Sequence, residues 1–352
     1  MSRTMRAAVL HGREDVRIED VPVPRLEPGD VLIETRAALT CGTDGKVFRR
    51  GYHAKMLVPP ALFGHEVSGI VAEVGPGPHG IEPGASVVAA NSAPCGDCEY
   101  CLKGRETLCD DLLFWNGAYA EFVRIPARVA RRNLLRLPAG LGFREAAITE
   151  PLACVVRGIE ESRVVPGETV AIIGVGPIGL MLVALAHIRG ARVVAVGRRA
   201  DRLQLAREMG ADATVMLGPR DDLGDLLKRE SPEGRGPHVV FEAAGAPEAS
   251  EAAIRAVRKG GLVNLFAGCP ADSLIGIDAQ RVHYEELTIT STFHHTPQDI
   301  REALRLLGTG TMDPRSLITA EAPLEALPQV LGRMAQGDGL KTMIVPGGRD
   351  RP

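Results

Sequence analysis

Four of the seven cysteines in this chain of 352 residues lie in one short segment, CGDCEYCLKGRETLC. They are Cys95, Cys98, Cys101 and Cys109. Thiolates this close in sequence can surround one tetrahedral Zn²⁺, and a full set of four protein ligands leaves no open position for a substrate. The spacing therefore predicts a structural zinc site.

Two disulfides or an iron–sulfur cluster are the alternatives for these cysteines. Disulfides need an oxidising compartment, and the first residues, MSRTMRAAVLHGRED, contain no apolar segment that would direct secretion. Iron–sulfur clusters usually have other spacings and often a proline after the last cysteine, whereas Asp110 follows Cys109. The sequence favours zinc and a cytoplasmic location.

The composition argues against several classes of partner. The chain has 41 basic and 44 acidic side chains, so it lacks the charge that nucleic acids or anionic membranes attract. The uncharged stretch from Val170 to Ile188 is interrupted by glycine and proline, which favours a buried strand and helix over a membrane span. We expect a small-molecule substrate, and neither nucleic acid nor membrane as a partner.

Two patterns along the chain predict an α/β protein with two domains. Up to about residue 150, short alternating apolar runs between Pro and Gly are typical of an antiparallel β domain. Beyond Pro166, strands alternate with helices, which indicates a parallel sheet covered on both faces. The strands are expected at 170–174, 191–196, 213–216, 238–241, 261–267 and 287–293, and the helices at 177–189, 201–209, 222–230 and 249–257.

The domain limits follow from the same patterns. We assign 1–154 to the β-rich domain and 155–294 to the α/β domain. The remaining segment, 295–352, is too small and too mixed in pattern for a third domain. We expect it to return to the first domain.

A glycine-rich motif, Gly174-Val-Gly176-Pro177-Ile178-Gly179, fits G-x-G-x-x-G between a predicted strand and a predicted helix. Gly174 permits a tight turn, Gly176 lets the backbone approach a pyrophosphate, and Gly179 lets the helix pack against the sheet. This context predicts a dinucleotide site. The alternative is a glycine-rich turn with no ligand.

The choice of cofactor is expected at the end of the next strand, where the chain has Gly197, Arg198 and Arg199. Enzymes that use NAD normally have Asp or Glu there to bind the ribose. Two guanidinium groups instead suit a 2′-phosphate, and cations at a helix N-terminus are unfavourable unless an anion joins them. We expect NADP(H) in preference to NAD(H). The alternative is two solvated arginines and less selective NAD binding.

Further short motifs occur in a fixed order along the chain. They are CGTD at 41–44, GHE at 64–66, GASV at 84–87, GAYAE at 117–121 and EPL at 150–152. Together with the cysteine segment and the glycine motif, they resemble the zinc-dependent medium-chain alcohol and polyol dehydrogenases over nearly the whole chain. The resemblance implies a GroES-like antiparallel β catalytic domain and a Rossmann doubly wound dinucleotide-binding domain.

The same resemblance implies a second, catalytic zinc, and so two zinc ions per chain. Cys41 and His65 match the two constant ligands, and Glu150 stands where the polyol and threonine dehydrogenase branches place a Glu. Glu66 matches a residue that alternates between binding the metal and contacting its ligands. Cys154 is expected to be a buried free thiol, and whether Cys154 or Glu66 is a ligand stays open. Such a site keeps one position open for water or a substrate oxygen.

The implied reaction passes a hydride from a zinc-polarised alcohol to the nicotinamide. Thr43 resembles the hydroxyl that takes the alcohol proton in this family. Lys46 replaces a histidine that relays the proton in many relatives. It can relay a proton, contact a polar substrate or the cofactor phosphates, or lie in a solvated turn with Arg49 and Arg50. Arg157 stands where relatives often have His, and we assign it no role.

Polar candidates for the substrate pocket are Glu150, Lys46, His294 and His295, while Trp115 either lines the pocket or belongs to the core. A Glu-ligated zinc and few aromatic residues resemble the polyol branch, so we expect a secondary alcohol of a polyol, cyclitol or sugar alcohol as the substrate. The alternatives are an L-threonine 3-dehydrogenase, an NAD-dependent alcohol dehydrogenase, and a metal-site-defective NADPH-binding reductase or binding protein. Similar proteins are homodimers or homotetramers, and we expect the same here.

Overall fold

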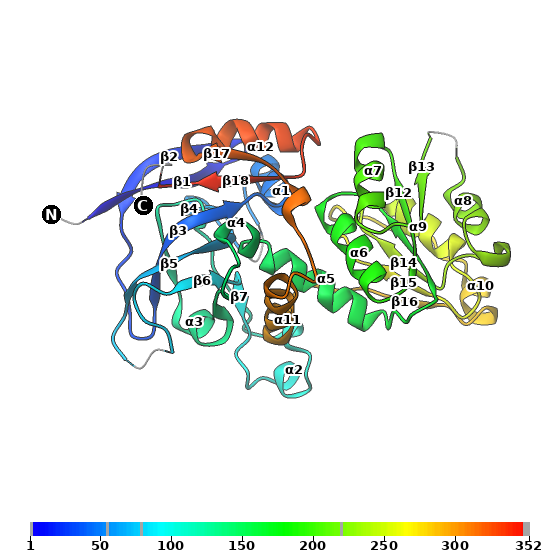
Figure 1. Ribbon diagram of the computed structural model, residues 1–352, viewed down its shortest axis with the longest axis horizontal. Coiled ribbons are helices and arrows are strands. Elements are labelled where there is room, and N and C mark those ends of the chain that lie inside the picture. Colours follow the sequence, from blue (N-terminus) through cyan, green and yellow to red (C-terminus); the bar gives the residue numbers. More distant parts are fainter. Residues whose placement is uncertain (1–2, 54–55, 78–79, 219–220, 348–352) are drawn as a thin grey trace. The chain divides into compact units, whose positions relative to one another are not determined.

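The chain folds into two compact units, one formed by residues up to 153 with those from 295 onward, and one by 154–294 (Figure 1). The computed structural model describes residues 3–53, 56–77, 80–218 and 221–347. Among the helices in these ranges, none is long and apolar enough to cross a membrane. Each unit has its own hydrophobic core.

The first unit consists mainly of antiparallel strands. The strands are β1 (Thr4–Gly12), β2 (Asp15–Pro22), β3 (Val31–Leu39), β4 (Ala61–Leu62), β5 (Glu66–Val74), β6 (Ser86–Ala89), β7 (Ser92–Ala93), β8 (Leu113–Phe114), β9 (Phe122–Ile125), β10 (Leu134–Arg136), β17 (Ile318–Pro323) and β18 (Lys341–Val345). The largest sheet has the order β10-β6-β5-β3-β18-β17, with β9 also paired to β3, and a smaller sheet has the order β2-β1-β4. The antiparallel β domain implied by the sequence is confirmed.

Helices in the first unit lie between these strands in the chain. They are α1 (Gly42–Arg50), α2 (Glu99–Leu102), α3 (Ala127–Asn133), α4 (Phe143–Ala146), α11 (Pro297–Gly308) and α12 (Leu327–Ala335). Helix α11 illustrates why they form. The Thr296 hydroxyl accepts a hydrogen bond from the Asp299 N–H, and the Asp299 carboxylate accepts one from the Thr296 N–H. Ile300, Leu304 and Leu307 then recur at helical spacing and are buried.

The C-terminal segment completes the largest sheet of the first unit. Strand β18 pairs antiparallel with β3, with Met343 opposite Leu39 and Ile344 opposite Ala38. Strand β17 then adds to β18 in parallel. The residues just before and within β18 therefore lie next to the end of β3, which leads directly into the CGTD motif.

The second unit is a parallel sheet of six strands in the order β13-β12-β11-β14-β15-β16. The strands are β11 (Thr169–Ile173), β12 (Arg192–Gly197), β13 (Ala213–Met216), β14 (Val239–Glu242), β15 (Leu262–Leu265) and β16 (Thr288–Thr290), and the helices are α6 (Pro177–Ile188), α7 (Ala200–Glu208), α8 (Leu223–Arg229), α9 (Pro247–Ala256) and α10 (Ala279–Tyr284). All of β11 is buried, as expected for a strand covered on both faces. This is the doubly wound order, so the predicted fold class is confirmed.

The structure also contains elements that the sequence pattern did not predict. Helix α5 (Thr149–Glu161) carries Glu150 and runs across the limit between the two units. Helix α10 follows Asp278, whose carboxylate accepts two backbone N–H bonds at the helix start. Of the expected strand 287–293, only Thr288–Thr290 forms a strand (β16), and these three residues pair in parallel with Leu262–Asn264 of β15.

A test of the close packing in the second unit is the substitution Gly179→Ala. A Cβ at Gly179 would lie 1.7 Å from the carbonyl oxygen of Gly174, so α6 would have to shift. We expect a loss of about 2 kcal/mol or more and a melting temperature lower by several degrees, measured by thermal unfolding. The matched control is Gly332→Ala in α12, where a Cβ would meet no atom within 4 Å. It should leave stability unchanged or raise it slightly. Equal effects of the two substitutions would contradict this packing.

Candidate metal centres and nucleotide site

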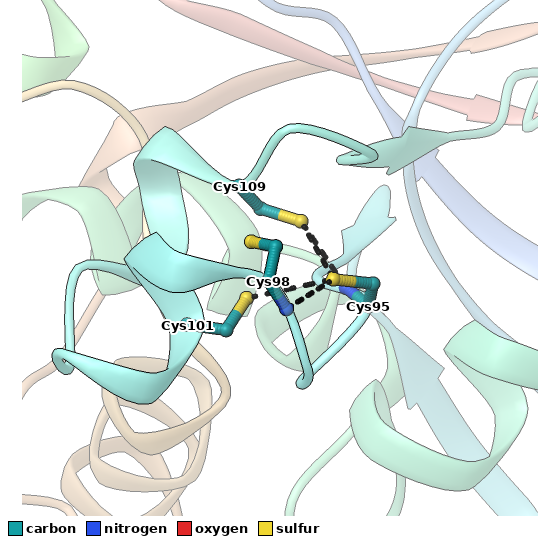
Figure 2. A group of neighbouring side chains, drawn as sticks. All are labelled: Cys95, Cys98, Cys101 and Cys109. Atoms are coloured by element: carbon teal, nitrogen blue, oxygen red, sulfur yellow. Dashed lines mark hydrogen bonds between the residues drawn. The ribbon is translucent and has the colours of Figure 1, made fainter.

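The four cysteine side chains of the CGDCEYCLKGRETLC segment converge on one point (Figure 2). The Sγ atom of Cys95 lies 3.9 Å from that of Cys101 and 3.4 Å from that of Cys109. Both distances exceed the ~2.05 Å bond of a disulfide and are close to the ~3.8 Å edge of a tetrahedron with Zn–S bonds of ~2.3 Å. The arrangement fits a zinc ion.

Backbone groups around the same sulfur atoms favour negative charge. The N–H of Cys95 donates to the Cys109 sulfur and the N–H of Cys98 donates to the Cys95 sulfur. Backbone N–H groups lower the pKa of the Cys98 thiol to about 7, whereas burial raises the pKa of the Cys101 thiol to about 12. A divalent cation among the sulfurs would favour the thiolate form of all four.

A second group of metal-ligating residues lies in the first unit. The ligand atoms of Cys41, His65 and Glu66 lie within 4.8 Å of one another. Cys41 immediately precedes α1, while His65 and Glu66 lie at the start of β5 and are both buried. Glu150 is outside this group of three, but its charge helps to raise the pKa of Glu66. The structure therefore brings these four residues, from three segments of the chain, to one region.

The Asp44 carboxylate connects two of the predicted ligands. It is 1% exposed, and its Oδ2 accepts hydrogen bonds from the Cys41 N–H at 2.9 Å and from the Tyr119 hydroxyl at 2.6 Å. Its Oδ1 lies 3.0 Å from His65 Nδ1. Burial alone would lower the pKa of His65, but Asp44 raises it well above its usual range. A carboxylate on one ring nitrogen orients the histidine and leaves the other nitrogen for a metal.

Tyr119 reaches Asp44 because Gly64 has no side chain. A Cβ at Gly64 would lie 2.5 Å from the Tyr119 ring, and its φ of +93° also favours glycine. The tyrosine is fully buried and packs edge-on against Phe63, with the ring centroids 5.8 Å apart. The glycine of the GHE motif therefore contributes to the position of His65.

Glu66 forms a buried ion pair with Lys341. The Lys341 Nζ donates to the two carboxylate oxygens at 2.7 and 2.6 Å, and also to the Thr40 carbonyl at 3.0 Å. Burial raises the pKa of Glu66 to about 7, against the opposing effect of Lys341. Burial alone would lower the pKa of Lys341, but Glu66 raises it. The Glu66 carboxylate therefore contacts a cation of the chain and also lies within 4.8 Å of the ligand atoms of Cys41 and His65.

Glu150 contacts the C-terminal segment through His295. The His295 Nε2 lies 3.5 Å from Glu150 Oε1 and 3.2 Å from Asn91 Oδ1, and all three residues are buried. The preceding residue, His294, has a positive φ of 63° and is half-buried. Cys154, one turn after Glu150 in α5, is half-buried, where we expected a buried side chain.

Of the remaining predicted residues of the first unit, one lies beside His65 and the others lie elsewhere. Thr43 lines a small hollow together with His65. Lys46 lies on the exposed face of α1 and not in a turn. Trp115 belongs to the core, since it is 5% exposed and its indole N–H donates to the Ala90 carbonyl. It does not line the hollow beside Thr43.

The glycine motif lines a cavity of about 670 Å³ in the second unit, at the carboxyl ends of the strands. This volume is ordinary for a site that holds a small ligand. Gly174 and Gly176 line it, and a Cβ at Gly176 would meet no atom within 4 Å. Helix α6 begins at Pro177, so its N-terminal N–H groups are available to phosphates near this turn. The residues fit a dinucleotide.

Arginines line the same cavity where β12 ends. Arg198 and Arg199 follow Gly197, and Arg202 joins them from α7. Arg199 also pairs with Asp201 at 2.9 Å on the surface. Acidic side chains contribute to the lining as well: Asp221, Asp222 and Glu248. Arg202 was not among the predicted residues, although its position near Arg198 on a predicted helix would have been a signal.

Sequence reasoning also missed residues that support the predicted ligands. Asp44 occupies the third position of a helix whose N-cap is Cys41, a recognisable capping pattern. Lys341 is a single cation two residues before the apolar run MIV, a position typical of a buried charge that has a partner. Tyr119 lies in the GAYAE motif, but the motif did not indicate its contact with Asp44, and for Asn91 we find no signal in the sequence.

Comparisons with known proteins agree with this geometry. Residues 27–138 match the family described as alcohol dehydrogenase GroES-like domain, and residues 177–309 match the family described as zinc-binding dehydrogenase. The chain is 30% identical to sorbitol dehydrogenase of Bacillus subtilis (strain 168), covering 98% of both chains. It is 32% identical to L-threonine 3-dehydrogenase of Bacillus licheniformis, covering 98% of this chain and 100% of that protein. A protein of Sinorhizobium meliloti 1021, described as a zinc-binding dehydrogenase bound to NADP, has a TM-score of 0.90 and 31% identity, covering 98% of this chain and 100% of that one.

Substitutions in the two cysteine-containing groups should have different effects. We expect Cys98→Ser to remove one zinc ion per chain and to lower the melting temperature by several degrees, because a structural zinc contributes directly to folding. We expect Cys41→Ser to lose one zinc and at least about a hundredfold in turnover while the melting temperature changes little. Cys269→Ser, at a free cysteine outside both groups, is the control. Full turnover in Cys41→Ser would contradict the assignment.

The Glu66–Lys341 pair predicts strong coupling between two substitutions. Lys341→Met leaves a carboxylate buried without its cation and should cost about 3–5 kcal/mol in the free energy of unfolding. Glu66→Gln combined with Lys341→Met removes both charges and should restore much of this loss. Denaturant unfolding of the two single variants and the double variant measures the coupling energy. Additive effects would mean that the two side chains do not depend on each other.

Proposed function

The chain belongs to the zinc-dependent medium-chain dehydrogenases, and on that premise we propose that it transfers a hydride between a secondary alcohol and NADP. The proposed substrate is a polyol, cyclitol or sugar alcohol, or the corresponding ketone in the reverse direction. The similarity to a sorbitol dehydrogenase over 98% of both chains supports this substrate class. The presence of Glu150 is compatible with this class and equally with the threonine dehydrogenase alternative, because both branches have a Glu there.

The observation that carries the proposal is the grouping of Cys41 and His65 around the Asp44 carboxylate, with Glu150 nearby. We propose Cys41, His65 and Glu150 as the residues that hold the catalytic zinc, with Glu66 beside them. When bound, such an ion supplies a Lewis acid that lowers the pKa of an alcohol oxygen. Asp44 orients the His65 ring, and His295 orients the Glu150 carboxylate. The quartet at Cys95–Cys109 would hold the structural zinc.

Proton movement is proposed to begin at Thr43. Thr43 and His65 line the same small hollow, which supports a role for the Thr43 hydroxyl in taking up the alcohol proton. Lys46 follows Thr43 by nearly one helical turn and is exposed, which suits passage of a proton to solvent. In the second unit, Gly174, Gly176 and the start of α6 would bind the pyrophosphate.

The preference for NADP rests on charge where β12 ends. Gly197 stands where a carboxylate would favour NAD, and Arg198, Arg199 and Arg202 line the cavity beside it. Guanidinium groups bind phosphate oxygens in pairs of hydrogen bonds and keep their charge at neutral pH. The NADP described with the similar Sinorhizobium meliloti protein also supports this choice.

The experiment that tests the proposed function measures metal content and activity together. Two zinc ions per chain, together with reduction of the nicotinamide on polyols, cyclitols or sugars, would support it. Activity on L-threonine alone would favour the threonine dehydrogenase alternative. One zinc and no activity with any alcohol would favour a reductase or binding protein without a working catalytic metal. Light scattering on the same sample tests the proposed homodimer or homotetramer.

Substitution of the arginines tests the cofactor preference. We expect Arg198→Ser combined with Arg199→Ser to lower kcat/KM for NADP at least about tenfold, because two charge-assisted contacts to the 2′-phosphate are lost. The kcat/KM for NAD should change little. Arg207→Ser is the control, since Arg207 is exposed on α7 but does not line the cavity. A wild-type preference for NAD would overturn the assignment.

A further inference from the structure

A second hollow lies at the amino ends of the parallel strands, at the sheet edge opposite the nucleotide cavity. It has a volume of about 260 Å³ and is lined by Glu168, His238, Arg258, Lys259, Gly260 and Gly261. Glu168 immediately precedes β11, His238 precedes β14, and Gly261 precedes β15. The hollow is therefore formed by the starts of three neighbouring strands and has no part in the proposed reaction.

His238 makes an unusual pair of contacts in this hollow. Its Nδ1 accepts a hydrogen bond from the Thr169 backbone N–H at 3.0 Å. Burial and the charge of Arg258 lower the pKa of His238, which favours the neutral ring. A neutral ring with Nδ1 as acceptor carries its hydrogen on Nε2. That nitrogen lies 2.6 Å from Nη1 of Arg258, so two N–H donors face each other with no acceptor between them.

The cations around the hollow also have no carboxylate partner among the described residues. In the part of the chain that the structure describes, Arg258 and Lys259 form no ion pair with a carboxylate. Glu168 lines the same hollow without pairing to either cation. Two cations and a histidine N–H donor around one hollow are typical of oxyanion sites in proteins. When an oxyanion is bound, each of these donors contacts a charged acceptor.

We propose that this hollow, defined by His238, Arg258 and Lys259, is an anion site for a phosphate group, either inorganic phosphate or a phosphate monoester. A phosphate oxygen would accept hydrogen bonds from His238 Nε2 and from the Arg258 guanidinium, so the two donors would no longer oppose each other. Lys259 adds a second positive charge at the rim. Glu168 faces the same space and weakens the binding by charge repulsion.

Phosphate titration of the whole protein tests this site. Melting temperature and calorimetry are followed with inorganic phosphate and, separately, with glycerol phosphate, at an ionic strength kept constant with sodium chloride. We expect both ligands to stabilise the protein, whereas chloride alone does not. Tighter binding of the monoester would identify an organic phosphate as the ligand, and equal or weaker binding would identify inorganic phosphate.

Substitutions locate the bound phosphate. Arg258→Gln should weaken binding about tenfold, as expected for loss of a charge-assisted contact, and Lys259→Gln should weaken it less. Glu168→Gln should strengthen it about threefold, because the repulsion is removed. Lys228→Gln, at an exposed lysine of α8 outside the hollow, is the control and should change nothing.

The nucleotide cavity is the competing location for phosphate, and Arg199→Gln distinguishes the two. Phosphate binding that persists in Arg199→Gln and is weakened in Arg258→Gln supports the proposal. Binding that is lost in Arg199→Gln and unchanged in both Arg258→Gln and Lys259→Gln would overturn it, as would the absence of any stabilisation by phosphate. Lys259 is exposed, so its variant gives a result even if Arg258→Gln does not fold.

Discussion

Glu66 and Lys341 carry opposite charges into the core of the first unit, where neither is more than 2% exposed. Removing either charge from water is costly, and the pair is tolerated because Lys341 contacts both carboxylate oxygens and the Thr40 carbonyl. These contacts join the start of β5, the residue before Cys41 and the first residue of β18. The positions of Cys41 and His65 therefore depend on β18, whose first residue, Lys341, lies 275 residues after Glu66 in the sequence.

The two candidate metal centres differ in how far apart their residues lie in the sequence. The cysteine quartet lies in one short segment, and its sulfur atoms already converge with backbone N–H groups around them. The group around Cys41 needs α1, β5 and the buried ring of Tyr119, with Asp44 as the common acceptor. A metal bound by the quartet can stabilise its own segment, whereas the second centre forms only when the β domain has folded.

The parallel sheet presents different chemistry at its two edges. At the carboxyl ends of the strands, an open glycine backbone and four arginines line a cavity suited to a dinucleotide. At the amino ends, short connections bring His238, Arg258 and Lys259 around a smaller hollow. Both arise from the same topology, because neighbouring parallel strands all begin at one edge and end at the other.

Local spacing was enough to predict the alternation of strands and helices after Pro166, the glycine motif and the cysteine quartet, because each depends on residues close in sequence. The resemblance to the dehydrogenase family added the prediction that Cys41, His65 and Glu150 belong to one metal site. The pattern did not reveal α5, the contact of His295 with Glu150, or that Lys46 lies in a helix. It also did not reveal that Lys341 neutralises Glu66, because the pairing of buried charges follows from how distant segments pack. Spacing along the chain limits only the distances between near neighbours, so those contacts were decided by the tertiary structure.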